Sequence, residues 1–339
     1  MSFLQDEERS APELNENEIA ESSRLAGKAE GLVMELAGAL PAPQPAPMLE
    51  RLDRYEKLLD DYHAHFQRAS LEELSLSYAS EWVLDNYYIL RQAVQQVRED
   101  LAPGYLKRLA KIDRFGQAGH PRVYFVARDY LEAAALQVDE EMLEEFTRRV
   151  VDGLSADASA GRLTLSMGEL WALPIFLRYT LIESILFALR EIMRLQSDSG
   201  PEIAPFGMDV SCEEMVASAV VGLREVSNLD WKVFFEAVNP VDRLLRQDPV
   251  GIYARMEFDT RNRYRTAVEE IAFRSGRAES SVAAAALELA QGAAPVQEAE
   301  TEPIDIRQAH IGYWLVDAGR AALEQAVGIR PGARDWARQ

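Results

Sequence analysis

The chain has 339 residues and a formal net charge of −20, because 56 Asp and Glu residues outnumber 36 Lys and Arg residues. Proteins that bind along nucleic acid neutralise its phosphates with clustered cations, so this charge excludes nucleic acid as a partner and disfavours direct binding to an anionic membrane surface. Apolar residues make up 48% of the sequence and charged residues 27%. These fractions are typical of globular proteins with a substantial core, and they exclude a fibrous or disordered chain.

Neither a disulfide nor a membrane span is indicated. Cys212 is the single cysteine, so it has no partner for an intrachain disulfide. The first residues are acidic, whereas a signal peptide begins with basic and then apolar residues. The most apolar stretch, residues 170–192, contains Arg178, Glu183 and two further charges, and it therefore lacks the ~20 uncharged residues of a spanning helix.

The pattern along the chain predicts four segments. Residues 1–47 read as a disordered lead, a short helix and a proline-rich linker, because alternating prolines fix the backbone and remove hydrogen-bond donors. Residues 48–292 read as one helical domain, since apolar residues recur at spacings of three and four. An acidic linker is predicted at 293–306, and a C-terminal helical tail at 307–339.

Two long helices are predicted at the centre of an all-α multi-helix bundle. At about 100° per residue, the apolar residues of 71–99 form two stripes, which indicates packing on more than one side. The segment 167–195 is apolar around most of its circumference. The predicted bundle is therefore built around these two segments.

Three helix starts follow from Ser-x-x-Glu patterns at Ser70, Ser166 and Ser211. In this pattern the serine hydroxyl and the glutamate carboxylate bond to main-chain amides that the first helical turn leaves without partners. Only the runs 122–127 and 311–316 have the composition of strands, and neither has a hairpin partner nearby.

Two charged residues fall among the apolar residues of the predicted central helices. Asp85 lies beside the main apolar stripe of the first helix, and Arg178 lies among apolar neighbours in the second. A lone buried charge is costly, so we hypothesise a structural ion pair between Asp85 and Arg178. The alternative is that Arg178 extends its guanidinium to solvent.

Six blocks in a fixed order, spread over about residues 50–325, carry a resemblance. The most specific block is 168–175, followed closely by Leu177 and Arg178. The other blocks are 81–89, 97–103, 120–124, 248–253 and 310–315. In this order the blocks resemble the N-terminal region of the bacterial cyclic β-1,2-glucan synthases, although the stretch 106–109 departs from the pattern of that family.

The resemblance implies a role in glucan synthesis. Those synthases are large inner-membrane proteins that use UDP-glucose to build and close a β-1,2-linked glucan, with a transferase domain embedded among membrane helices. The present chain resembles the cytoplasmic region that precedes the membrane section. The resemblance thus implies membrane-embedded glucan synthase domains as partners, in cis or in trans, and a location at the cytoplasmic face of the inner membrane.

No catalytic site, metal site or cofactor is predicted. Metal-dependent sugar transferases hold their cation with an Asp-x-Asp motif, which the sequence lacks. His63 and His65 point about 200° apart on a helix, so they do not share a metal ion. We therefore expect a non-catalytic accessory domain of a glucan synthase-like glycosyltransferase, with a stand-alone helical scaffold or interaction adaptor as the alternative.

Two groups of residues have the chemistry of sugar contacts, because they combine aromatic faces with carboxylates or amides. Aromatic residues at helical spacing are more often core residues, so packing is the favoured interpretation for both groups. The candidates for contact with β-1,2-glucan are Trp82, Asp85, Asn86, Tyr87 and Tyr88 in the first group, and Glu169 and Trp171 in the second.

Overall fold

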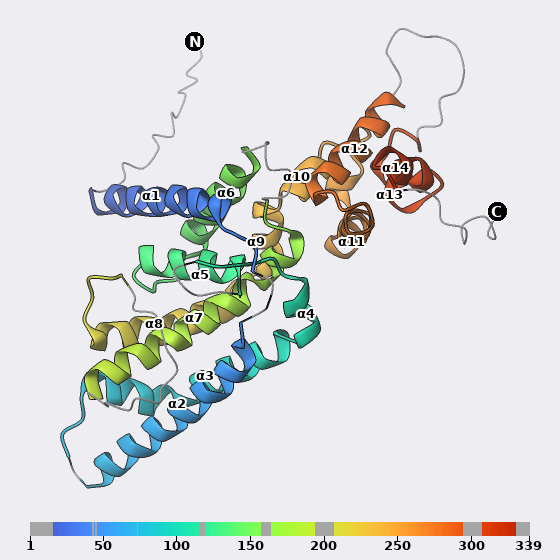
Figure 1. Cartoon of the computed structure of the whole chain (residues 1–339). Helices are drawn as coiled ribbons and strands as arrows, with labels where there is room; N and C mark the ends of the chain where they lie inside the picture. The colour runs from blue at the N-terminus through green and yellow to red at the C-terminus, as the bar shows by residue number, and fades with distance from the viewer. Residues whose placement is uncertain are drawn as a thin grey trace, which may run out of the picture.

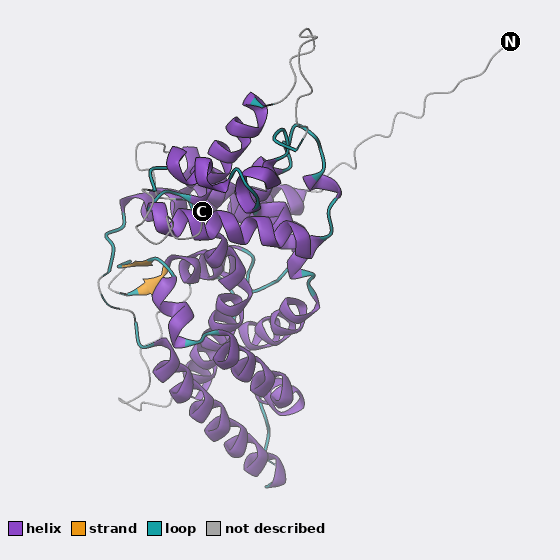
Figure 2. Ribbon diagram, turned by 90° about the vertical axis from the view of Figure 1, so that its right-hand side faces the viewer, coloured by secondary structure: helices purple, strands orange, loops and turns teal. Residues whose placement is uncertain are grey.

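The computed structural model describes residues 16–42, 44, 46–72, 74–114, 119–156, 164–193, 207–293 and 307–329. These residues form fourteen α-helices, one short 3₁₀ helix and one two-stranded antiparallel sheet (Figure 2). The prediction of an all-α fold is confirmed. Residues 1–15 of the predicted lead, and residues 294–306 of the acidic linker predicted at 293–306, lie outside the described residues.

The elements follow one another along the chain as shown in Figure 1. They are α1 (Glu16–Gly38), α2 (Met48–Leu71), α3 (Tyr78–Asp100), α4 (Pro103–Arg108), β1 (Lys111–Ile112), β2 (His120–Pro121), α5 (Arg122–Ala133), α6 (Glu140–Ala156), α7 (Met167–Met193), α8 (Cys212–Asn228), α9 (Trp231–Val238), α10 (Pro240–Leu245), η2 (Tyr253–Arg255), α11 (Phe258–Ser275), α12 (Glu279–Gly292), α13 (Ile311–Val316) and α14 (Arg320–Ala326).

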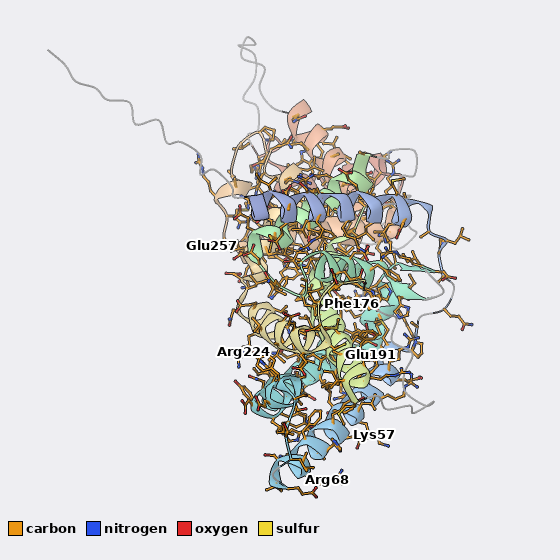
Figure 3. All side chains as sticks on the ribbon, turned by 90° about the vertical axis from the view of Figure 1, so that its left-hand side faces the viewer. Lys57, Arg68, Phe176, Glu191, Arg224 and Glu257 are labelled. Carbon is orange, nitrogen blue, oxygen red and sulfur yellow. The ribbon has the colours of Figure 1, made fainter. Side chains whose placement is uncertain are left out.

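Helix α7 occupies the centre of the fold by itself. It packs on α2, α3, α5, α8 and α9, and its Phe176 lies in the middle of the molecule (Figure 3). Its length and apolarity would allow it to cross a bilayer, but 89% of its most apolar window is buried inside the protein. It therefore has the surroundings of a core helix. Helix α3 is one of several helices around it, packed on α2, α7 and α8.

Helix α8 approaches α7 closely because of one glycine. A Cβ atom on Gly222 would lie 2.9 Å from the carbonyl oxygen of Leu136 and 3.1 Å from a methyl carbon of Leu181. A larger residue would push α8 away from the core. Helix α8 also packs on α3, and these two helices form the groove described below.

The N-terminal helix is part of the packed body. Helix α1 packs on α5 and α6, and it buries Leu25, Ala29, Leu32 and Leu36. The core therefore includes residues that precede Met48. The proline-rich stretch that follows α1 is also held in place, since the amide of Ala42 donates to the carbonyl of Lys111 at 3.0 Å.

Two of the three predicted helix starts are confirmed and one is wrong. Ser211 forms a complete capping box with Glu214, and Ser166 forms the same bonds with Glu169. Ser70, however, lies in the last turn of α2. Helix α3 begins after Ser77, whose hydroxyl accepts a hydrogen bond from the amide of Ser80. The stretch between these helices forms an exposed corner because α2 and α3 turn back on each other there.

The two runs with strand composition are both helical. Residues 122–127 form the start of α5, in which each of these side chains is buried, and 311–316 form α13. Full burial selects bulky apolar residues in either secondary structure, so composition alone does not decide between them. Each strand of the small sheet has two residues, with Lys111 opposite Pro121 and Ile112 opposite His120.

The last helices form a group at one end of the molecule, opposite the corner between α2 and α3 (Figure 1). Helix α12 packs on α10, α11, α13 and α14. Asp248 anchors α13, because its carboxylate accepts hydrogen bonds from His310 Nδ1 at 2.8 Å and from the amide of Ile311 at 3.1 Å. Burial raises the pKa of Asp248, but these hydrogen bonds outweigh it and leave the pKa below its usual value.

Candidate functional site

A groove between α3 and α8 combines polar and aromatic side chains above an apolar floor. Its volume is about 260 Å³. The floor consists of Ile89, Ala93 and Leu223, and the walls consist of Tyr88, Gln92, Gln96, Arg224, Ser227 and Asn228. The groove offers a site for a small polar ligand.

Helical spacing explains how the groove is built. In α3, the buried residues Ile89 and Ala93 are four positions apart and share one face. Tyr88 and Gln92 follow the same spacing one position earlier, and both are exposed at the edge of that face. Leu223 of α8 closes the floor from the opposite side. The apolar floor therefore holds the two helices together while the polar residues stay accessible.

A kink in α3 at Asn86 lets this residue bond to Arg224, which lines the groove. Asn86 has non-helical torsion angles, with φ −118° and ψ 15°. Its Nδ2 donates to the carbonyl oxygen of Trp82 at 2.9 Å, and its Oδ1 accepts a hydrogen bond from Arg224 Nη2. The amide of Asn86 thus orients the guanidinium of Arg224, which lines the groove. Arg224 is labelled on α8 in Figure 3.

The groove carries a single positive charge on a strongly acidic protein. No lining residue is a carboxylate. Among the described residues, Arg224 has no carboxylate within 4.0 Å, and its hydrogen bond goes to the neutral amide of Asn86. The unoccupied donors of its guanidinium therefore remain available to an acceptor in the groove.

A second, larger groove lies between α1 and α6 and has a volume of about 800 Å³. Six of its lining residues are carboxylates, namely Glu21, Asp139, Glu140, Glu141, Glu144 and Glu145. Arg148 and Arg149 bond to carboxylates one turn earlier on α6. In the part of the chain that the structure describes, no three His, Cys, Asp or Glu side chains are grouped to hold a metal ion.

The structure distributes the first group of predicted contact residues over different sides of α3. Tyr88 lines the groove, and Asn86 supports it. Tyr87 instead donates to Asp60 of α2 and stacks on His63 at a centroid distance of 3.6 Å. Burial, together with this hydrogen bond, raises the pKa of Tyr87 to about 12. Tyr87 therefore joins α2 to α3.

The remaining members of this group do not line the groove. Trp82 is half-buried against the core, with its ring edge-on to Tyr78 at 6.0 Å. Asp85 is exposed on α3. Of the five residues in the first group, the groove accordingly brings together Tyr88 and, in support, Asn86.

The second predicted group, Glu169 and Trp171, is built into the packing between helices. Glu169 is 1% exposed, and its carboxylate accepts hydrogen bonds from Arg122 Nε at 3.0 Å and Nη2 at 2.7 Å. The ring of Trp171 stacks on Phe235 at 4.2 Å. Neither residue lines the groove between α3 and α8.

The predicted ion pair between Asp85 and Arg178 is not formed. Asp85 is exposed, whereas Arg178 is 8% exposed and donates to the carbonyl oxygen of Pro174 in its own helix at 3.2 Å. Burial lowers the pKa of Arg178, and its Nε has no hydrogen-bond partner among the described residues. Arg178 is therefore neither paired with Asp85 nor extended into solvent.

A buried carboxyl group of α7 also has a structural role. Glu183 accepts hydrogen bonds from the hydroxyls of Tyr55 at 2.7 Å and Tyr124 at 2.9 Å. Burial raises the pKa of Glu183, and these two hydrogen bonds oppose that rise. The three residues come from α2, α5 and α7, so the carboxyl group joins three helices inside the core.

Glu279 gives the fold a pH dependence. Burial raises the pKa of its carboxyl group to about 7, and the charges of Glu269 and Glu169 add to this rise, although the bond from the amide of Met167 opposes it. Because the pKa of Glu279 is raised in the folded chain, the contribution of this group to the free energy of unfolding is complete below the usual carboxyl pKa. This contribution is lost as the pH rises through 7. We expect Glu279 to decrease the free energy of unfolding by about 2 kcal/mol between pH 5.5 and pH 8.

Urea unfolding of the wild-type chain and of Glu279→Gln at these two pH values measures this effect. The variant keeps an acceptor for the amide of Met167 but has no carboxyl group that ionises. Between the two pH values, its free energy of unfolding should therefore fall by about 2 kcal/mol less than that of the wild type. Equal pH dependence in the two proteins would contradict the assignment.

The described residues thus define an all-α protein with a small polar groove that has no carboxylate in its lining. The chain is similar to the cyclic beta-(1,2)-glucan synthase NdvB of Rhizobium meliloti (strain 1021), with 28% identity over 330 residues. The match covers 76% of this chain and 11% of that relative, so the resemblance is confirmed for a part of a much longer protein. No family model matches the chain.

Proposed function

We propose that this chain is a non-catalytic accessory region of a cyclic β-1,2-glucan synthase-like system that uses UDP-glucose. The observation that supports the proposal is the similarity over 76% of the chain to a protein named for this synthesis. The sequence contains no Asp-x-Asp motif to hold a cation for a sugar diphosphate. The buried acids Glu169 and Glu183 are held in hydrogen bonds between helices, which is a structural use of a carboxyl group.

In this proposal the chain acts at the cytoplasmic face of the inner membrane, in contact with membrane-embedded synthase domains in cis or in trans. The net charge of −20 disfavours attachment to anionic lipid headgroups. Contact with the membrane-embedded domains would therefore be made by protein surfaces.

A tagged chain, expressed in a bacterium that makes cyclic β-1,2-glucan, tests the proposal. We expect the chain to co-purify with the synthase from detergent-solubilised membranes, and we expect removal of this region to lower the UDP-glucose-dependent production of glucan in those membranes. Restoration by the separately expressed chain is the positive control. Full glucan production without the region, together with no co-purification, would contradict the proposal.

A stand-alone scaffold or adaptor is the second candidate. It is favoured by the exposed corner between α2 and α3, where Leu71 is 84%, Leu74 56% and Tyr78 52% exposed. Contiguous exposed apolar residues of this kind are typical of surfaces that bind other proteins. The same purification separates the two candidates, because an adaptor would be recovered with proteins other than the synthase.

A further inference from the structure

We infer that the groove between α3 and α8 binds a short segment of neutral β-glucan. The choice of glucan rests on the proposed function, while the ligand class follows from the groove itself. The groove joins one exposed aromatic ring, three side-chain amides, one hydroxyl and one guanidinium over an apolar floor. No resemblance block or predicted site included the residues that α8 contributes.

The apolar elements of the groove match the carbon-bound hydrogens of a sugar ring. Tyr88 is 65% exposed, and it borders a floor formed by Ile89, Ala93 and Leu223. An aromatic face provides a large apolar contact with little loss of side-chain freedom, and it leaves the hydroxyls of a stacked ring free for polar partners.

The polar elements match the hydroxyls of the same ring. Gln92, Gln96 and Asn228 each provide donors and an acceptor. The hydroxyl of Ser227 donates to the carbonyl oxygen of Leu223 at 3.0 Å, so it offers the groove an acceptor. A sugar hydroxyl also donates and accepts, so amide side chains suit it better than a row of like charges. Arg224 adds donors that are already oriented by Asn86, which reduces the cost of ordering a long side chain on binding.

The groove disfavours the other ligand classes. A cation finds no carboxylate among the lining residues. A nucleotide sugar carries two phosphates, for which one guanidinium is a weak match on a protein with a net charge of −20. The volume of about 260 Å³ falls just below the ~300–1,000 Å³ of pockets for drug-sized ligands. It therefore suits one or two sugar rings.

Titration of linear β-1,2-glucan oligosaccharides into the full chain tests the inference, with saturation-transfer NMR and calorimetry as the readouts. We expect binding by the wild type and a loss of affinity of about tenfold or more in Tyr88→Ala, because the stacking face is removed. Gln92→Ala should weaken binding as well. The matched control is Tyr78→Ala, which removes an exposed tyrosine of the same helix that does not line the groove.

Thermal unfolding of all variants shows whether they keep the wild-type fold, and the exposure of Tyr88 and Gln92 leads us to expect that they do. The inference is overturned if wild-type protein binds no oligosaccharide, if Tyr88→Ala binds as tightly as Tyr78→Ala, or if UDP-glucose displaces the oligosaccharide. Affinity should also be nearly independent of salt, since a neutral ligand is not screened; a steep fall at high salt would indicate an anionic ligand at Arg224 and overturn the assigned class. Co-purification with the synthase is a separate measurement, and it does not depend on glucan binding by the groove. Failure of the glucan proposal is therefore distinguishable from failure of the proposed function.

Discussion

Asp242→Ala is expected to lower the free energy of unfolding by about 3–5 kcal/mol. Asp242 is fully buried and accepts a hydrogen bond from Arg265 Nη1 at 2.7 Å and one from the hydroxyl of Tyr253 at 2.6 Å. Arg265 is 1% exposed, so removal of the carboxylate leaves a buried cation without this partner. Glu236, at 2.9 Å from the same Nη1, neutralises part of that charge.

Urea unfolding monitored by circular dichroism measures the effect. Asp85→Ala is the matched control, because Asp85 is an exposed aspartate in a helix, and it should change stability by less than about 0.5 kcal/mol. Asp242→Asn keeps the shape and one acceptor, so its loss should fall between the two. A change in Asp242→Ala as small as in the control would show that Asp242 does not stabilise Arg265.

Glu169→Ala should destabilise the chain by a similar amount, about 3–5 kcal/mol. Its carboxylate is the partner of Arg122, which is 6% exposed, and it also accepts hydrogen bonds from the amide and the hydroxyl of Ser166 at the start of α7. The substitution therefore removes a buried ion pair and a helix cap at once.

Ser166→Ala separates these two contributions. It removes the capping hydroxyl but keeps the carboxylate opposite Arg122, so we expect a loss of about 1 kcal/mol. Calorimetric melting of both variants gives the comparison. If Glu169→Ala melted like wild type but bound glucan more weakly, Glu169 would contact the sugar, which was the less favoured interpretation of the sequence, and would not primarily hold the fold.

The sequence predicted where helices begin better than it predicted which elements pack against each other. The helix starts at Ser166 and Ser211 were found because a capping box is a local pattern, complete within four residues. The start at Ser70 was wrong because Ser70 lies in the last turn of α2, which ends at Leu71. Placing 71–77 in the helix misplaced its apolar stripe, since Leu71 and Leu74 are exposed.

The predicted ion pair between Asp85 and Arg178 was wrong because the packing partners of the two helix faces were not known from the sequence. Helical periodicity gives the angle between two side chains on one helix, but it does not say which element covers each face. Asp85 faces solvent, and Arg178 is buried beside the carbonyl of Pro174 in its own helix. The non-helical residue Asn86 further changes the phase between the two halves of α3, which a straight-helix calculation does not include.

Of the nine residues that line the groove, the predicted contact residues included one, Tyr88, and they also included Asn86, which bonds to Arg224. Tyr88 and Asn86 were selected because an aromatic residue and an amide occur together, and that combination is visible in the sequence. Arg224, Ser227 and Asn228 were missed, because they lie about 140 positions later and meet α3 only through the packing of α8. A single sequence contains no signal for such a contact between distant helices.

The anchoring of α13 by Asp248 has a consequence for how such chains can diverge. The docking position of the last two helices is specified by a carboxylate more than sixty residues upstream, next to η2, and by its bonds to His310 and Ile311. A change in the length of the segment between α12 and α13 would therefore leave both bonds, and with them the position of α13, in place.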